Sequence, residues 1–208
     1  MIHSGFYLYD GAGEFGTACA DVCRAAGMAR HEHPDGTLVA IAPLLKRKLS
    51  IQEAELPLYG TLIFHPSILP LHRGPDAIKW SMSRMERLSG VTWFWCDSGL
   101  DTGPICEQEP VVVNLKHSPG RNYHSRFVPA GIRSLARAID GVLRCEPRKV
   151  PQEHELGSYE GFFTEPDKYV CGYCGLPATI GSYHEGPEDC ATEARMLSGT
   201  SNNLTLPV

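Results

Sequence analysis

The sequence predicts an α/β fold with a mainly parallel sheet, because short buried strands alternate along it with amphipathic helices. Residues 36–45, GTLVAIAPLL, open with a continuous apolar run, which is typical of a strand buried on both faces. A second apolar run, at residues 61–64, ends at a proline that closes the strand. Two further β-rich segments follow at residues 91–96 and 110–113. Together these segments indicate a sheet covered by helices.

Two segments carry helical signals. Residues 75–89 begin with Pro75, which suits a first helical position, and Gly90 is expected to end the helix. The expected buried stripe of this helix is Ile78, Met82, Met85 and Leu88. Residues 129–144 predict a second helix. Its apolar stripe consists of Ile132, Leu135, Ala136, Ile139, Val142 and Leu143.

The length of 208 residues suggests one domain with a small appendage. We expect the catalytic domain to occupy residues 1–150, because the composition then shifts to polar residues, glycine and proline. Residues 151–168 are expected to form a linker and residues 169–192 a small cysteine- and histidine-bearing unit. Residues 193–208 are expected to be a flexible tail.

Charge and hydropathy exclude several classes of protein. The net charge of −5 argues against nonspecific nucleic-acid binding, which depends on clustered cations. No apolar run reaches the ~18 to 20 residues that span a bilayer, and the first residues lack the pattern of a secretory signal. Eight cysteines without such a signal indicate a reducing compartment. We therefore expect a cytoplasmic protein with no membrane partner.

One histidine and one aspartate stand out as a candidate catalytic pair. His65 follows a buried strand, at the end where open α/β sheets hold their ligands. Asp101 lies in a glycine-flanked turn after a later strand. A carboxylate beside an imidazole orients the ring and stabilises its charged form, which suits acyl or formyl transfer. The residues alone leave a structural histidine and a turn-forming aspartate as alternatives.

The motifs around this pair resemble those of the N10-formyltetrahydrofolate formyltransferase family. The resemblance rests on HPSILP followed by HRGPDAIKW, and on DSGLDTG, whose second aspartate lies 36 residues after the histidine. It continues more weakly through YHSRFVPAGI and PQEHELGSYEG, and covers about residues 36–161. The family includes methionyl-tRNA formyltransferase, sugar N-formyltransferases and the hydrolase domain of 10-formyltetrahydrofolate dehydrogenase. The resemblance implies a Rossmann-like sheet and 10-formyltetrahydrofolate as the cofactor.

The resemblance also implies roles for individual residues. His65 and Asp101 match the family's catalytic histidine and aspartate. Arg73 is a candidate to meet the acidic tail of folate or an anionic acceptor, with a solvated loop residue as the alternative. The expected folate-binding residues are Leu44, Leu45, Ser67, Ile68, Leu69, Pro70, Arg73, Gly74, Asp97, Ser98 and Gly99.

Ile63 marks a departure from most transferases of the family, which have asparagine two residues before the histidine. Isoleucine cannot donate a hydrogen bond to a developing oxyanion, and losing one such donor typically costs ~10²–10³ in rate. The hydrolase domain of the dehydrogenase resembles this chain in having isoleucine there. We therefore expect hydrolysis of the formyl group, or transfer to an unusual acceptor. The alternatives are an N-formyltransferase acting on an amino acid, amino sugar or aminoacyl-tRNA, and a non-catalytic folate-binding module.

The N-terminus is a second departure, because the resemblance implies a first strand–helix–strand unit of which we expect about 30–60 residues to be absent. Residues 5–28 are expected to supply the surviving second strand and its following helix. A lost edge strand leaves backbone donors unpaired and invites pairing with another chain. We therefore expect a homodimer that completes the sheet.

A cluster of cysteine and histidine residues follows the region of resemblance. Its spacing, Cys-x2-Cys-x9-His-x5-Cys, predicts a structural zinc site formed by Cys171, Cys174, His184 and Cys190. Free thiols and a redox pair are the alternatives.

Overall fold

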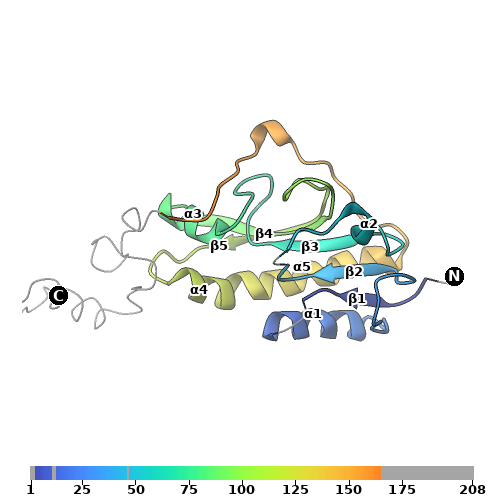
Figure 1. The fold of residues 1–208 in the computed structure, drawn as a ribbon. Helices are drawn as coiled ribbons and strands as arrows, with labels where there is room; N and C mark the ends of the chain where they lie inside the picture. The colour runs from blue at the N-terminus through green and yellow to red at the C-terminus, as the bar shows by residue number, and fades with distance from the viewer. Residues whose placement is uncertain (1–2, 11–12, 46, 165–208) are drawn as a thin grey trace, which may run out of the picture.

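The computed structural model describes residues 3–10, 13–45 and 47–164, and the α/β fold is confirmed over them. A five-stranded sheet forms the middle of this part of the chain, with the strands in the order β1-β2-β3-β4-β5 (Figure 1). The strands are β1 Phe6–Leu8, β2 Val39–Ala42, β3 Thr61–His65, β4 Leu88–Trp95 and β5 Ile105–Val112.

The sheet is mixed rather than wholly parallel. β1, β2 and β3 pair in parallel, whereas β4 is antiparallel to both of its neighbours. Four of the five described strands therefore point the same way, and only β4 opposes them. This reversal places the carboxyl ends of β3 and β4 at opposite edges of the sheet, because His65 is opposite Thr92 and Leu62 is opposite Trp95.

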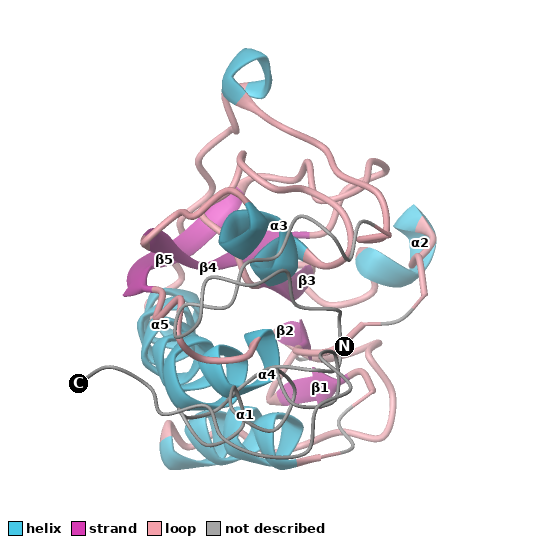
Figure 2. Cartoon of the chain, turned by 90° about the vertical axis from the view of Figure 1, so that its left-hand side faces the viewer, coloured by secondary structure: helices cyan, strands magenta, loops and turns pink. Residues whose placement is uncertain are grey.

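Helices cover both faces of the sheet. The helical elements are α1 Glu14–Ala25, α2 Ile51–Ala54, α3 Ala77–Ser83, α4 Pro119–Asn122, the π-helix Tyr123–Phe127, α5 Val128–Leu143 and the 3₁₀-helix His154–Leu156. Helices α1, α4 and α5 lie on one side, and α2 and α3 lie on the other (Figures 1 and 2).

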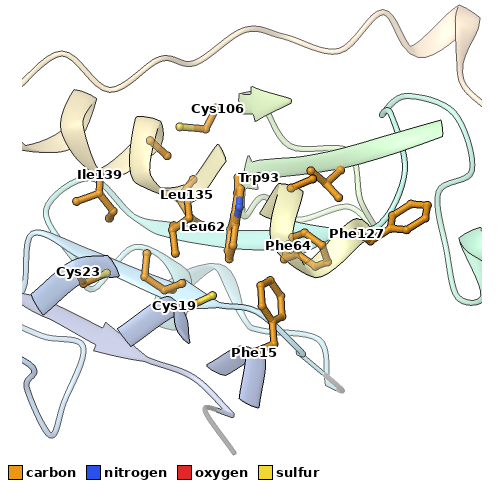
Figure 3. Packing of buried hydrophobic residues seen from close by; sticks show 14 of the residues in the cluster. Phe15, Cys19, Cys23, Leu62, Phe64, Trp93, Cys106, Phe127, Leu135 and Ile139 are labelled. Atoms are coloured by element: carbon orange, nitrogen blue, oxygen red, sulfur yellow. The ribbon is translucent and has the colours of Figure 1, made fainter. Parts of the chain in front are cut away.

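The main hydrophobic core lies between the sheet and the layer of α1 and α5 (Figure 3). Phe15 and Cys19 from α1, and Leu135 from α5, pack there against Phe64 and Trp93 of the sheet. The indole Nε1 of Trp93 donates to the carbonyl oxygen of Gly131 at 2.9 Å. A Cβ at Gly131 would lie 2.7 Å from the ring of Phe64, so the glycine lets α5 approach the sheet closely.

Local apolar patterns predicted the second expected helix well and the first one poorly. The expected helix 129–144 corresponds to α5, where Leu135, Ile139 and Val142 are buried, although Ala136 and Leu143 are exposed. The expected helix 75–89 is wrong beyond Ser83.

Leu88 belongs to β4 instead, and Gly90 lies inside that strand rather than ending a helix. A Cβ at Gly90 would lie 2.5 Å from the carbonyl oxygen of Glu109 and 2.2 Å from the side chain of Ile68. The glycine is therefore needed for close packing within the sheet.

β1 is an edge strand, and its outer side is partly paired. The backbone N–H of Phe6 donates to Ala29 at 2.8 Å, and the N–H of His31 donates back to Phe6 at 2.8 Å. These bonds cover one residue of the three-residue strand. The homodimer stays a prediction.

The chain after α5 returns to the domain. Residues 151–164, which we expected to act as a linker, lie against the loops after β3 and β4, and Gln152, Glu160 and Phe163 are buried. The expected zinc ligands Cys171, Cys174, His184 and Cys190, and the tail 193–208, lie outside the described residues. Within the described residues, no helix combines the length and apolar character that crossing a membrane requires.

Replacing Leu135 with alanine tests the placement of α5. Leu135 is fully buried, so Leu135→Ala should lower the free energy of unfolding by about 2–5 kcal/mol. Ala136→Ser, on the exposed face of the same helix, should change it by less than about 0.5 kcal/mol. Urea unfolding followed by circular dichroism measures both. Equal losses would contradict the orientation of this helix.

Candidate active site

His65 is the last residue of β3, and the alternation of the strand sets where its side chain points. Phe64 points into the main core with α1 and α5. Ile63 and His65 therefore share the other face of the sheet. There Ile63 packs on a second apolar cluster that includes Ala42 and Leu49.

The loop after β3 holds the ring of His65 from one side. The imidazole Nε2 lies 2.7 Å from the backbone carbonyl oxygen of His72. A carbonyl oxygen can only accept a hydrogen bond, so Nε2 carries the proton. When the ring is neutral, its unprotonated nitrogen is therefore Nδ1.

The loop itself is fixed to the sheet by Thr92 of β4. The Thr92 hydroxyl donates to the carbonyl oxygen of Ser67 at 2.7 Å and accepts from the N–H of Leu69 at 3.1 Å. The Ser67 hydroxyl donates in turn to the carbonyl oxygen of Leu71 at 2.6 Å. These bonds connect the loop to the interior of the sheet.

Asp101 reaches His65 along a turn that runs back beside β3. The turn leaves β4 at Cys96, whose N–H donates to Thr61 at the start of β3. It is stabilised by Asp97, which accepts from the N–H of Gly99 at 3.0 Å and from the hydroxyl of Thr102 at 2.9 Å. The motifs predicted that His65, after one strand, and Asp101, in a turn after a later strand, meet at one cleft. The antiparallel direction of β4 makes this returning turn necessary.

The structure brings His65 and Asp101 together. Asp101 Oδ2 lies 3.7 Å from His65 Nδ1 and accepts a hydrogen bond from the N–H of Gly74 at 2.7 Å. A separation of 3.7 Å is too long for a hydrogen bond, but it allows an ion pair when the ring is protonated. Asp101 adopts a left-handed backbone conformation, φ 55°, which few non-glycine residues do without support from their surroundings.

Burial controls the charge of His65. The residue is only 6% exposed, and this desolvation lowers the pKa of His65 below its ordinary value. The carboxylate of Asp101 opposes the effect. The neutral ring is therefore favoured at neutral pH, with Nδ1 free to accept a proton and Asp101 beside it to stabilise the charge that results.

A cavity of about 790 Å³ opens over this pair. Ligand pockets commonly occupy roughly 300–1,000 Å³ and combine an apolar lining with a few polar groups. Among the residues predicted from the sequence, those lining the cavity are Leu44, Leu45, Ile63, His65, Gly74, Asp97, Gly99 and Asp101.

The remaining predicted folate-binding residues lie outside the lining. They are Ser67, Ile68, Leu69, Pro70, Arg73 and Ser98. Ser67 and Leu69 are buried beneath the loop, where their backbone meets Thr92.

Arg73 has a different environment from either of the two expected for it. Its guanidinium is buried and donates to the side-chain oxygen of Gln152 at 2.7 Å and contacts the ring of His154 at 3.0 Å. It is neither a solvated loop residue nor a cation facing the cavity.

Cys96 also lines the cavity. Burial raises the pKa of the Cys96 thiol to about 11, so the thiolate is scarce at neutral pH. Within the described ranges, no group of three histidine, cysteine or carboxylate side chains could hold a metal ion.

Sequence reasoning missed the contribution of residues 151–164. Tyr159, Gly161 and Phe162 line the cavity, and Gln152 bonds to the turn of Asp101. The segment is polar and contains proline and glycine, and this composition predicted a linker rather than part of the cavity wall. The motif PQEHELGSYEG, which extends the family resemblance into this segment, was the signal that could have found it.

The family model described as formyl transferase matches residues 37–139. These residues belong to the formyl transferase family. The formyl transferase domain thus includes β2 to β5, both His65 and Asp101, and most of α5.

Curated relatives are similar over the same region. The chain is 32% identical to mitochondrial 10-formyltetrahydrofolate dehydrogenase of Homo sapiens over 126 residues, which is 61% of this chain and 14% of that protein. It is 30% identical to methionyl-tRNA formyltransferase of Methylacidiphilum infernorum (isolate V4) over 111 residues, covering 53% of this chain and 34% of that protein. The chain therefore spans a minor part of the length of these relatives.

Solved structures show the same fold as this formyl transferase domain. HypX from Aquifex aeolicus in complex with tetrahydrofolic acid superimposes with a TM-score of 0.67 at 19% identity, covering 79% of this chain and 30% of that one. The formyltransferase PseJ from Anoxybacillus kamchatkensis gives a TM-score of 0.64 at 20% identity, covering 84% of this chain and 95% of that one.

The protonation of His65 is directly measurable. Because burial lowers the pKa of His65, its ring should titrate below the ordinary value of about 6.5. Asp101→Asn should lower this pKa further, since the carboxylate favours the charged ring. NMR of ¹⁵N-labelled histidine, assigned with a His65→Gln variant, measures both. Titration above the ordinary value would contradict the described environment.

Proposed function

We propose that the domain removes the formyl group of 10-formyltetrahydrofolate, with His65 as general base and Asp101 as its charge-stabilising partner. The observation that carries the proposal is the anchored ring of His65, whose free Nδ1 lies 3.7 Å from Asp101 Oδ2 at the cavity wall. Membership of the formyl transferase family supports this substrate class. A folate substrate is also supported by the names of two similar proteins, the 10-formyltetrahydrofolate dehydrogenase and HypX in complex with tetrahydrofolic acid.

The chemistry follows from the available nitrogen. The nucleophile gives its proton to Nδ1 of His65 while its electron pair attacks the formyl carbon. The imidazolium that forms is stabilised by Asp101 as negative charge builds on the formyl oxygen. The bond from the formyl carbon to N10 of the folate then breaks, and N10 takes the proton from His65. Water as nucleophile yields formate, whereas an amine yields a formamide; both release tetrahydrofolate.

Ile63 favours water, or an unusual acceptor, over an ordinary amine. It occupies the cavity-facing position two residues before His65 and packs on an apolar cluster, so it supplies no donor for an oxyanion. We therefore favour the hydrolase, with an amine N-formyltransferase as the second candidate. The name of the methionyl-tRNA formyltransferase relative supports that second candidate. A non-catalytic folate-binding module is the third.

A product assay tests the proposal and separates these candidates. Protein incubated with 10-formyltetrahydrofolate should release tetrahydrofolate and formate in equal amounts without added amine. A panel of amino acids and amino sugars should leave the rate unchanged. Release that depends on an amine would instead favour the transferase, and binding without turnover across the panel would contradict the enzymatic role.

The variant Asp101→Asn tests the role of the carboxylate. The amide oxygen can still accept from the N–H of Gly74, so the turn should persist and folate should bind with a similar dissociation constant. Turnover should fall by about 10²–10⁴, the usual contribution of acid–base catalysis. Asp35→Asn, in an exposed loop, is the matched control and should keep wild-type kinetics. Activity in Asp101→Asn near that of the control would contradict the mechanism.

A further inference from the structure

Residues 152–160 form a strap that lies against the loop after β3. Ser158 donates its N–H to Pro70 at 3.2 Å and accepts from the N–H of Arg73 at 3.0 Å. The N–H of Glu160 donates to Arg73 at 2.9 Å. This pairing is close, because a Cβ at Gly74 would lie 2.2 Å from the carbonyl oxygen of Glu160.

The strap holds His72, the residue that anchors His65. The backbone N–H of His72 donates to the hydroxyl of Ser158 at 2.8 Å, while its carbonyl accepts from His65 Nε2 at 2.7 Å. Its side chain is 5% exposed and lies between two carboxylates. His72 Nε2 is 2.8 Å from Glu86, and Nδ1 is 3.4 Å from Glu160. The backbone N–H, the carbonyl oxygen and the ring of His72 therefore each have a partner that fixes their position.

Glu160 is itself buried, at 7% exposure, and its other oxygen lies 2.7 Å from the guanidinium of Arg84. A carboxylate in such a place is costly unless it is paired. Arg84 and His72 both lie within ion-pair distance of Glu160, and Glu86 lies on the other side of the His72 ring.

The other end of the strap holds the turn of Asp101. The Gln152 amide nitrogen donates to the carbonyl oxygens of Asp101 at 3.0 Å and Gly103 at 2.8 Å. The Gln152 oxygen accepts from Arg73 at 2.7 Å, so one side chain connects the Asp101 turn to the His72 loop. These bonds help to keep Asp101 in its left-handed conformation.

We propose that the strap positions both members of the catalytic pair, with Gln152 holding Asp101, and Ser158 and Glu160 holding His65 through His72. The expected effect on kcat rests on the proposed function, whereas the positioning of His65 and Asp101 does not. Gln152, Ser158 and Glu160 are positioning residues, since they touch the loops rather than the reacting atoms. A displacement of about 1 Å in such a pair can cost 10²-fold in rate.

The electrostatic environment of His65 provides a readout that does not need substrate. The titratable groups that act on its ring are Asp101 from the turn after β4, His72 from its own loop and Glu160 from the strap. Arg84 lies beside Glu160, and Glu86 lies beside His72. Burial lowers the pKa of His65, whereas Asp101, the hydrogen bond to the His72 carbonyl and Glu160 raise it; the side chain of His72 lowers it.

The experiment compares Gln152→Glu and Glu160→Gln with Glu155→Gln, which lies at an exposed strap position and makes the same charge change as Glu160→Gln. Glu160→Gln should move the NMR titration of His65 to lower pH. Gln152→Glu keeps the oxygen that faces Arg73 but loses the donor to the Asp101 turn, so kcat should fall about 10- to 100-fold, with KM changed less. Glu155→Gln should match the wild type in every measurement.

A His65 titration in Glu160→Gln that coincides with the control would overturn the proposal, as would wild-type kcat in Gln152→Glu. If the wild type turns over no formyl-folate, the proposed function fails, and the NMR comparison still decides the role of the strap. If Gln152→Glu does not fold, Ser158→Ala tests the strap instead, because it removes the hydroxyl that accepts from the N–H of His72. Ser158→Thr restores that hydroxyl. Loss of the His65 Nε2–H signal in Ser158→Ala and its return in Ser158→Thr supports the proposal, and an unchanged signal in Ser158→Ala contradicts it.

Discussion

The hydrogen bond from His65 Nε2 to the carbonyl oxygen of His72 is the constraint on which the rest of the site depends. It assigns the proton of the neutral ring to Nε2, so the basic nitrogen is the one that lies beside Asp101. Without this bond the ring could turn or change tautomer, and the cavity would lose its defined proton acceptor. The cis Leu69–Pro70 peptide, the Thr92 contacts and the strap all lie along the short loop that presents this carbonyl.

The mixed sheet explains why so many loops converge on one imidazole. β3 ends at His65, but β4 runs in the opposite direction, so the turn carrying Asp101 must return beside β3. Such a turn needs support, and it receives it from Gly74 on the His72 loop and from Gln152 on the strap. His65 and Asp101 are thus held by the loop after β3 and by residues 152–160, which are distant from each other in the sequence. Each uses backbone groups as well as side chains.

Local patterns predicted the elements that depend on apolar packing. β2 is buried along its whole length, as the run at residues 36–45 indicated, and α5 buries most of its predicted stripe. The helix 75–89 was overextended because Leu88 fits a helical stripe and a strand equally well, and only pairing with β5 decides between them. The meeting of His65 and Asp101 was expected from the motifs, whereas the route of the turn was not.

The roles of Arg73, Gln152 and Glu160 could not be predicted, because buried polar contacts between distant segments leave no periodic pattern. The claim that Nδ1 of His65 accepts the proton is tested most directly by the pH dependence of kcat/KM for 10-formyltetrahydrofolate. The account predicts an acid limb whose midpoint coincides with the NMR pKa of His65, below the ordinary histidine value. A kcat/KM that stays constant through the ionisation of His65 would contradict it.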